Sequence, residues 1–135
     1  MECQLAEETV QAFFGAWFVR RSAREAISFL SEDVSISGIE ENEVAQGKAV
    51  MAEYLKQYIQ KTPEPYGMKC TVLHKQPVTE NVCNLVLHLT LRNAGNSWRL
   101  HGFFTLVQDQ TAKWVICGLH LAEPRDRQQR ALLAE

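Results

Sequence analysis

Two histidines and an arginine, on two neighbouring stretches of alternating residues, are the side chains of this sequence best suited to chemistry. His88 lies in the first stretch, and Arg99 and His101 lie in the second, beyond the turn Asn93-Ala94-Gly95-Asn96. Alternation with a period of two predicts strands, and a short polar turn between them predicts an antiparallel hairpin. If the turn is a simple four-residue loop, His88 faces His101 and Thr90 faces Arg99.

This trio of side chains has four interpretations. A guanidinium presents a planar fork to a carboxylate and an imidazole changes charge near neutral pH, so the first is a site for an anionic or polar small molecule. The second is a wet sheet surface on which facing polar groups satisfy one another. The third is catalysis, with one histidine as general base. A metal site is disfavoured because Arg99 repels a cation and the same face offers no carboxylate, so we expect neither metal nor cofactor.

The strands that carry these residues have one polar and one apolar face. The polar face holds Asn84, Val86, His88, Thr90, Arg99, His101, Phe103 and Thr105. The apolar face holds a leucine ladder (Cys83, Leu85, Leu87, Leu89 and Leu91) together with Leu100, Phe104 and Leu106. On a curved sheet one of these faces lines the interior.

A second turn, Asp109–Ala112, leads into a third strand. The same pairing logic places Val107 opposite Trp114 and His101 opposite His120. One bulge in this strand pair would move His120 to the opposite face, so the face that His120 occupies stays open.

The rest of the chain predicts the elements that position this hairpin. Helices are expected over Leu5–Val19, from Ala23 behind the capping box Ser22/Glu25, and over Lys48–Gln60, with strands over Asp33–Ser37 and Met68–Gln76. Together with the meander they predict an α+β cone, in which three N-terminal helices pack on a strongly curved antiparallel sheet and leave a pocket at the open end.

Composition narrows the class of protein. The chain has 135 residues, a hydrophobic content of 46%, a charged content of 22% and a net charge of −2, as expected for one globular domain. The absence of a basic cluster argues against nucleic acid, and no apolar run approaches the ~20 residues of a membrane span. Met1–Gln4 lacks signal-peptide features, so we expect a cytoplasmic protein whose four cysteines, Cys3, Cys70, Cys83 and Cys117, are reduced.

The order of elements from Glu7 to Pro124 resembles the nuclear transport factor 2-like superfamily, and within it the SnoaL-like group. The resemblance lies in the opening helices with the strand entry Leu30-Ser31-Glu32-Asp33-Val34, in Gln46-Gly47-Lys48-Ala49-Val50 before the third helix, and in Lys113-Trp114-Val115-Ile116 followed by His120. It implies a cystatin-like α+β roll, with residues 1–124 forming one domain.

A closer resemblance lies in the acidic connection Gly38–Gly47. It is similar to the corresponding segment of SnoaL-like domains at the N-termini of bacterial signalling proteins, including diguanylate cyclases. That similarity implies a domain that senses a small molecule and passes the signal to a following output module. Residues 125–135, a polar helix or linker, fit such a handover, and Glu40, Glu41 and Glu43 are expected to be solvated loop charges.

The ketosteroid isomerases of this superfamily use a tyrosine, a carboxylate base and a protonated aspartate. Their pattern falls on Phe14, Gly38 and Phe103 here, so the resemblance implies that isomerase chemistry is absent. The same alignment turns the polar face inward. The implied pocket is floored by Phe103, walled by Phe14, Trp17 and Tyr54, and lined by Asn84, His88, Thr90, Arg99 and His101. The leucine ladder would then lie outside and form a homodimer interface through the sheet.

The sequence therefore predicts a dimeric, sensory domain that binds an anionic or polar small molecule. One alternative is a small SnoaL-like enzyme of the cyclase, dehydratase or isomerase type, with His88 or His101 as general base. The other is an association domain with a vestigial pocket.

Overall fold

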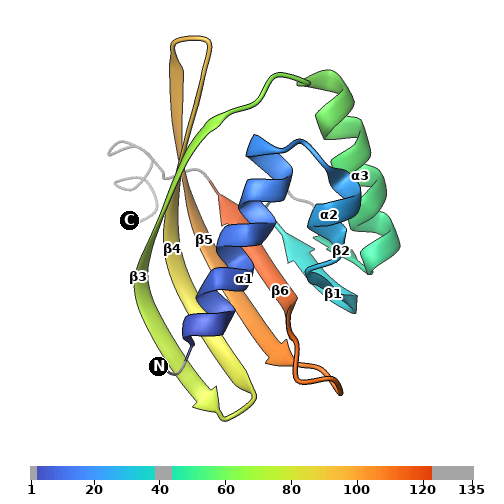
Figure 1. The fold of residues 1–135 in the computed structure, drawn as a ribbon, viewed down its shortest axis with the longest axis vertical. Helices are drawn as coiled ribbons and strands as arrows, with labels where there is room; N and C mark the ends of the chain where they lie inside the picture. Colours follow the sequence, from blue (N-terminus) through green and yellow to red (C-terminus); the bar gives the residue numbers. More distant parts are fainter. Residues whose placement is uncertain (1–2, 39–43, 123–135) are drawn as a thin grey trace, which may run out of the picture.

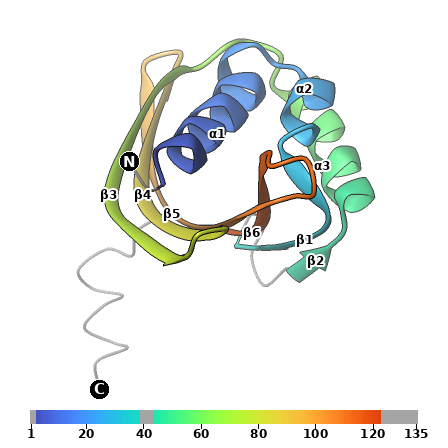
Figure 2. The same cartoon turned by 60° about the horizontal axis from the view of Figure 1, so that its bottom comes forward.

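A six-stranded mixed sheet curves around the N-terminal helix (Figures 1 and 2). The computed structural model describes residues 3–38 and 44–122. The elements are α1 (Gln4–Phe14), a π-helical segment η1 (Gly15–Val19), α2 (Ala23–Ile27), β1 (Leu30–Ser37), β2 (Val44–Gln46), α3 (Lys48–Lys61), β3 (Gly67–Thr79), β4 (Val82–Asn93), β5 (Asn96–Gln108) and β6 (Trp114–Ala122). The strand order is β2-β1-β6-β5-β4-β3, and β1 runs parallel to β6. The predicted α+β roll is confirmed, but the sheet expected to be antiparallel is mixed, because β1 pairs parallel with β6.

The first helix follows the sequence prediction but changes its winding at the end. The expected helix over Leu5–Val19 is present as α1 and η1, and its last turn is π-helical, with the N–H of Arg20 donating to the carbonyl of Gly15 at 2.9 Å. The wider turn allows Trp17 and Phe18 to be buried together. The predicted cap of α2 is also confirmed, because the Ser22 hydroxyl accepts from the N–H of Glu25.

The β4–β5 hairpin has the register predicted from its turn. His88 pairs with His101, Thr90 with Arg99, and Val86 with Phe103. The four turn residues determine the register, because a formed turn aligns the two strands and thereby fixes the cross-strand partner of every strand residue.

The predicted pairing of β5 with β6 is wrong by two residues at His120, which pairs with Phe103 instead of His101. One residue of the difference arises at the turn, where Gln108 rather than Val107 pairs with Trp114. The other arises at a register shift between Thr105 and Leu106. Because two one-residue shifts restore the side-chain alternation, His120 shares the face of Phe103.

The expected orientation of the sheet is wrong. Leu85, Leu87 and Leu89 of the leucine ladder are fully buried beneath α1, whereas the polar face is the outer face, the side of the sheet turned away from α1. The physical reason lies in α1. Phe13 and Phe14 need an apolar surface, and both pack against Phe104 on the leucine side at ring distances of 6.4 and 5.4 Å.

This correction also removes the proposed interface. Each fully buried leucine contributes about 1.5–3 kcal/mol of transfer free energy, so the leucine ladder is the centre of the core and not a surface for a second subunit. A homodimer through the leucine ladder is therefore wrong.

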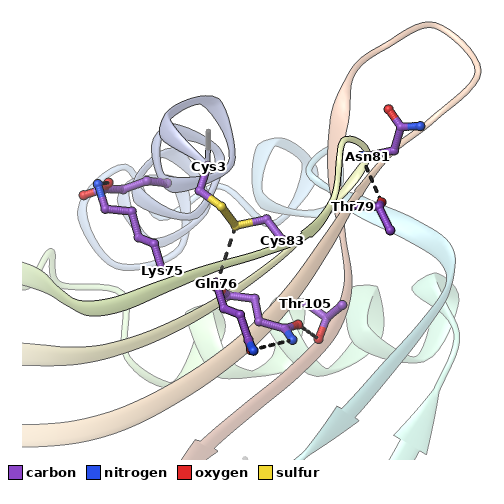
Figure 3. Close-up of a disulfide and its surroundings, with 9 residues drawn as sticks. Cys3, Lys75, Gln76, Thr79, Asn81, Cys83 and Thr105 are labelled. Carbon is purple, nitrogen blue, oxygen red and sulfur yellow. Dashed lines mark hydrogen bonds and ion pairs between the residues drawn. A yellow bond between two sulfur atoms is a disulfide. The ribbon is translucent and has the colours of Figure 1, made fainter. Parts of the chain in front are cut away.

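The expectation of four reduced cysteines is wrong for two of them. Cys3 and Cys83 form a disulfide with a Cα–Cα distance of 6.0 Å (Figure 3). Cys70 and Cys117 are free. The disulfide joins the start of α1 to the start of β4, across a sequence separation of 80. The pair shows no short spacing in the sequence, and only the packing of the helix on the sheet brings the two thiols together.

Two predictions fall on parts of the chain that are not described. The acidic residues Glu40, Glu41 and Glu43 and the segment 125–135 lie outside the described residues. Within the described ranges, no helix combines the length and apolar character needed to cross a membrane.

Candidate functional site

A pocket of about 260 Å³ lies between the end of α3 and the tip of the β4–β5 hairpin. Its walls are the side chains of Tyr58, Tyr66, Leu91, Trp98 and Leu100, and it is called the mouth pocket below. Three elements and one connection therefore meet around it. The lining residues are apolar or aromatic, and their polar side-chain groups are two phenol hydroxyls and an indole N–H.

The hairpin supplies one wall because of its register. Leu91 and Trp98 are cross-strand partners, and both lie on the inner side of the sheet, as does Leu100 two residues further along β5. Pro63 and Pro65, which follow α3, disfavour its continuation and direct the chain back toward the sheet. Tyr66 is then fixed by its backbone N–H, which donates to the carbonyl of Phe18 at 2.8 Å.

The two tyrosines form a polar pair in this apolar setting. Their hydroxyl oxygens lie 3.4 Å apart, at the long end of a hydrogen bond. Burial raises the pKa of Tyr58 well above its ordinary value, and the hydrogen bond with Tyr66 adds to the effect. Tyr58 therefore stays protonated at neutral pH and remains a hydrogen-bond donor.

Arg21 lies behind the tyrosine rings. Its guanidinium carbon is 5.6 Å from the centre of the Tyr58 ring and 5.2 Å from that of Tyr66. Nη1 donates to the carbonyl of Trp17 at 2.9 Å, and Nη2 donates to both the carbonyl and the hydroxyl of Thr62. Burial is the largest cause of the lowered pKa of Arg21. The buried Nε–H has no partner among the described residues.

A second buried donor lies nearby. The indole Nε1–H of Trp17 has no hydrogen-bond partner in the described part of the chain, and the residue is only 2% exposed. The Trp17 ring meets Tyr54 and Tyr58 edge-on, at 6.2 and 5.6 Å. Unpaired buried donors are rare in folded proteins, and they concentrate here at the aromatic end of the cone.

The structure brings His88 and His101 together, as predicted, but on the outer face. Their rings are stacked with centroids 4.7 Å apart. Arg99 is exposed on the same face, and the Phe103 ring is 46% exposed. The predicted pocket that combines these residues with Phe14, Trp17 and Tyr54 is wrong, because the sheet lies between the two groups.

The remaining predicted site residues are also on the outer face. Thr90 is half-buried beside Arg99, and the Asn84 side chain accepts from the hydroxyl of Thr105 at 2.8 Å. A groove of about 240 Å³ runs along this face between β1, β6 and β5, where the Ser37 hydroxyl lies 2.8 Å from Nδ1 of His120. Its lining is Ser35, Ile36, Ser37, Val44, Phe103, Thr105, Gly118, Leu119 and His120.

Sequence reasoning missed Arg21, Tyr66 and the pocket role of Tyr58. A signal was present for part of this set: Tyr54 and Tyr58 are one helical turn apart, and Arg21 follows directly on the first helix. Nothing local in the sequence connects these residues with Thr62 or Trp98. In the described ranges, no cluster of three or more histidine, cysteine or acidic side chains is arranged to hold a metal ion.

The isomerase alignment needs one correction. Phe103 points outward, and its inward neighbours on β5 are Gly102 and Phe104, neither of which is an acid. Gly38, at the position of the base, has a φ of +79°, and a Cβ there would lie 2.7 Å from the imidazole of His120. This position therefore has no room for a catalytic side chain.

Comparison with known proteins establishes the fold. No family model matches the sequence, and no curated protein matches it. A domain of unknown function with a cystatin-like fold from Nostoc punctiforme superposes with a TM-score of 0.80 at 13% identity, over 98% of this chain and 83% of that one. A ketosteroid isomerase-like protein from Erwinia carotovora atroseptica gives 0.77 at 17% identity, over 93% and 98%.

A third structure, an NTF-2-like protein of unknown function from Shewanella oneidensis, superposes with a TM-score of 0.74 at 15% identity, over 91% of this chain and 100% of that one. At these identities the similarity establishes fold and not activity. The chain has the cystatin-like α+β fold of nuclear transport factor 2-like proteins, as the order of its elements predicted.

Proposed function

We propose that this chain is a ligand-binding domain whose mouth pocket takes a small, mostly apolar ring compound with one hydrogen-bond acceptor. The observation that supports this most directly is the Tyr58–Tyr66 hydroxyl pair at the wall of an otherwise apolar pocket of about 260 Å³. Ligand pockets typically combine apolar walls with a few placed polar groups. A carbonyl or ether oxygen of the ligand would accept from a phenol.

The location of charge argues against the anionic ligand expected from the sequence. Arg99 lies on the outer face, away from the mouth pocket. Arg21 is close to the pocket, but both of its Nη atoms already donate to Trp17 and Thr62, and the tyrosine rings lie over its guanidinium. Only its Nε–H is without a partner among the described residues. The pocket is slightly smaller than the ~300–1,000 Å³ usual for drug-sized ligands, so a compound of one or two rings fits best.

The test is a thermal-shift screen of small neutral ring compounds, with and without a carbonyl. Hits should raise Tm by mass action. Leu100→Trp fills the pocket and should abolish the shift in Tm. Tyr66→Phe keeps the ring but removes the hydroxyl. It should lower the affinity for the ligand about fivefold or more, since one hydrogen bond is worth about 1 kcal/mol. His101→Ala, on the outer face, is the matched control. Hits that bind Leu100→Trp as well as wild type would disprove the mouth pocket as the site.

We further propose that the domain is sensory and dimeric, with an output module that follows residues 125–135. The similarity of the Gly38–Gly47 connection to sensory SnoaL-like domains supports the first part. The exposed Phe103 ring beside an open groove supports a homodimer through the outer face. Phe103→Lys should then produce a folded monomer in sedimentation experiments, and a wild-type monomer would exclude this interface.

The alternative is a small enzyme with a histidine base. His88 and His101 lie on the face away from the mouth pocket, so this alternative would need a substrate bound to the outer face. Retention of ligand binding and loss of a turnover activity in His88→Ala would favour it.

A further inference from the structure

We propose that the Cys3–Cys83 disulfide is a site of thiol–disulfide exchange, which small thiols reach through a cleft beside it. The cleft has a volume of about 150 Å³ and includes both cysteines in its lining. The other lining residues are Leu5, Pro77, Thr79, Glu80, Val82, Gln108 and Trp114. We call it the cystine cleft. It offers space for a compact thiol next to a bond that is otherwise buried.

The surroundings of the disulfide explain why the cleft is present. Cys3 is 5% and Cys83 is 1% exposed, so the two sulfur atoms belong to the edge of the core. On the sheet side, β3 shifts register between Pro77 and Thr79 just before the turn into β4, and both residues are exposed. A register shift interrupts the regular packing of the strand edge, and the cleft lies at this interruption.

The position of Cys3 at the start of α1 favours the release of its thiolate from the disulfide. Cys3 is the N-cap residue of α1, and in the disulfide form its side chain makes no capping hydrogen bond to the helix. The N-terminal end of a helix stabilises a negative charge, so a Cys3 thiolate that leaves the disulfide would be stabilised there. A better leaving thiolate accelerates exchange.

Two equivalents of the small thiol balance the reaction. The thiolate of one small thiol attacks a sulfur of the disulfide, the S–S bond breaks, and the other cysteine leaves as a thiolate that takes up a proton. A second small thiol then resolves the mixed disulfide. The protein gains two thiols and two hydrogens, and the two small thiols become one small disulfide.

Reduction would release one end of α1 without removing the rest of its packing. The salt bridge from Lys75 to Glu7, at 3.0 Å, and the buried residues Ala6 and Val10 still join the helix to the sheet. We therefore expect the reduced chain to stay folded with a looser first turn. The redox state of this pair would then set how firmly α1 is held.

The charge in the cleft predicts which thiols react fastest. Glu80, one of the lining residues, is an exposed acidic residue, and the nearby cation, Lys75, is paired with Glu7. An anionic thiol should be repelled and a cationic one attracted. Cysteamine should therefore reduce the disulfide faster than 3-mercaptopropionate, after correction for their intrinsic reactivities on a model disulfide.

The experiment uses the full chain, oxidised with a small disulfide and mapped by mass spectrometry without reduction. We expect a Cys3–Cys83 cross-linked peptide and free Cys70 and Cys117. Reduction under native conditions should follow a rate that rises linearly with thiol concentration. Val82→Trp, which narrows the cleft, should slow it about tenfold, and Glu80→Gln should remove the preference for cysteamine.

The experiment has two controls. The double variant Cys70→Ser/Cys117→Ser should leave the exchange kinetics unchanged. Circular dichroism of the reduced wild type should show retained secondary structure. Four free thiols after oxidation would overturn the proposal. So would a reduction rate that levels off with thiol concentration, because the bond would then open only when the chain unfolds.

Discussion

The guanidinium of Arg21 donates to the hydroxyl of Thr62 at 2.6 Å, and this contact joins the ends of two helices. Thr62 is the C-cap of α3. Nη1 of Arg21 donates to the carbonyl of Trp17 in η1, while Nη2 makes the contact with Thr62. The negative ends of two helix dipoles therefore share one cation. The helix ends therefore balance the positive charge of Arg21 without a carboxylate. The mouth pocket lies next to this arginine.

Replacing Arg21 with methionine should lower the free energy of unfolding by about 2–3 kcal/mol, because hydrogen bonds from a charged group are lost and two helix ends are left uncapped. Urea denaturation would measure the change. Arg20→Met is the matched control, since Arg20 makes only exposed contacts, an ion pair with Glu25 and a hydrogen bond to the carbonyl of Ala12, and its loss should cost less than about 1 kcal/mol. Equal effects of the two variants would contradict the capping role of Arg21.

Leu87→Lys should prevent folding, whereas a lysine at Phe103 should be tolerated by the monomer fold. Leu87 is fully buried, and an unpaired charge in the core costs several kcal/mol, a large part of the ~5–15 kcal/mol that a domain has. Phe103 is 46% exposed on the outer face. Far-UV circular dichroism of both variants provides the measurement. A folded Leu87→Lys monomer would mean that the leucine ladder is not the core.

Gly102→Ala should destabilise the protein by about 1–3 kcal/mol through overpacking. Gly102 pairs with Leu87, and a Cβ at this position would lie 2.7 Å from Cδ1 of Leu87. Gly95→Ala makes a useful comparison, because its positive φ introduces backbone strain but nothing lies within 4 Å of the added Cβ. Adding Leu87→Val to Gly102→Ala should restore part of the lost stability if the clash is the cause.

Stability should fall at alkaline pH because of Tyr58. Its pKa is raised in the folded state, first by burial and then by the hydrogen bond with Tyr66. The neutral phenol therefore favours folding fully below the ordinary tyrosine pKa of about 10, and this contribution is lost as the pH rises from there through the folded-state pKa. Denaturation of wild type and Tyr58→Phe between pH 8 and about 11 would measure the effect. The variant should show the smaller decline, and parallel declines would contradict the role of Tyr58.

The local part of this structure follows from the sequence. The turn Asn93–Asn96 determines the register of the β4–β5 hairpin, so His88 and His101 could be placed opposite each other without a structure. Ser22 and Glu25 define the start of α2 in the same way. In each case the interacting groups are separated by few residues, and the chain between them leaves little freedom.

Three results required the tertiary structure. Alternation divides β4 into two faces, but only the packing of Phe13 and Phe14 against the sheet decides which face is inside. The two one-residue shifts that keep His120 on the outer face depend on contacts along β5 and β6. The pairing of Cys3 with Cys83 and of Arg21 with Thr62 joins positions 80 and 41 residues apart.

The physical reason is the same in all three. A sequence pattern reports which side chains share a face, because that depends on the period of the backbone. It does not report which surface will cover that face, because this is settled by the summed burial of residues distant along the chain. The mouth pocket likewise could not be read from a sequence pattern, since α3, the segment before β3 and the β4–β5 hairpin each contribute part of its wall.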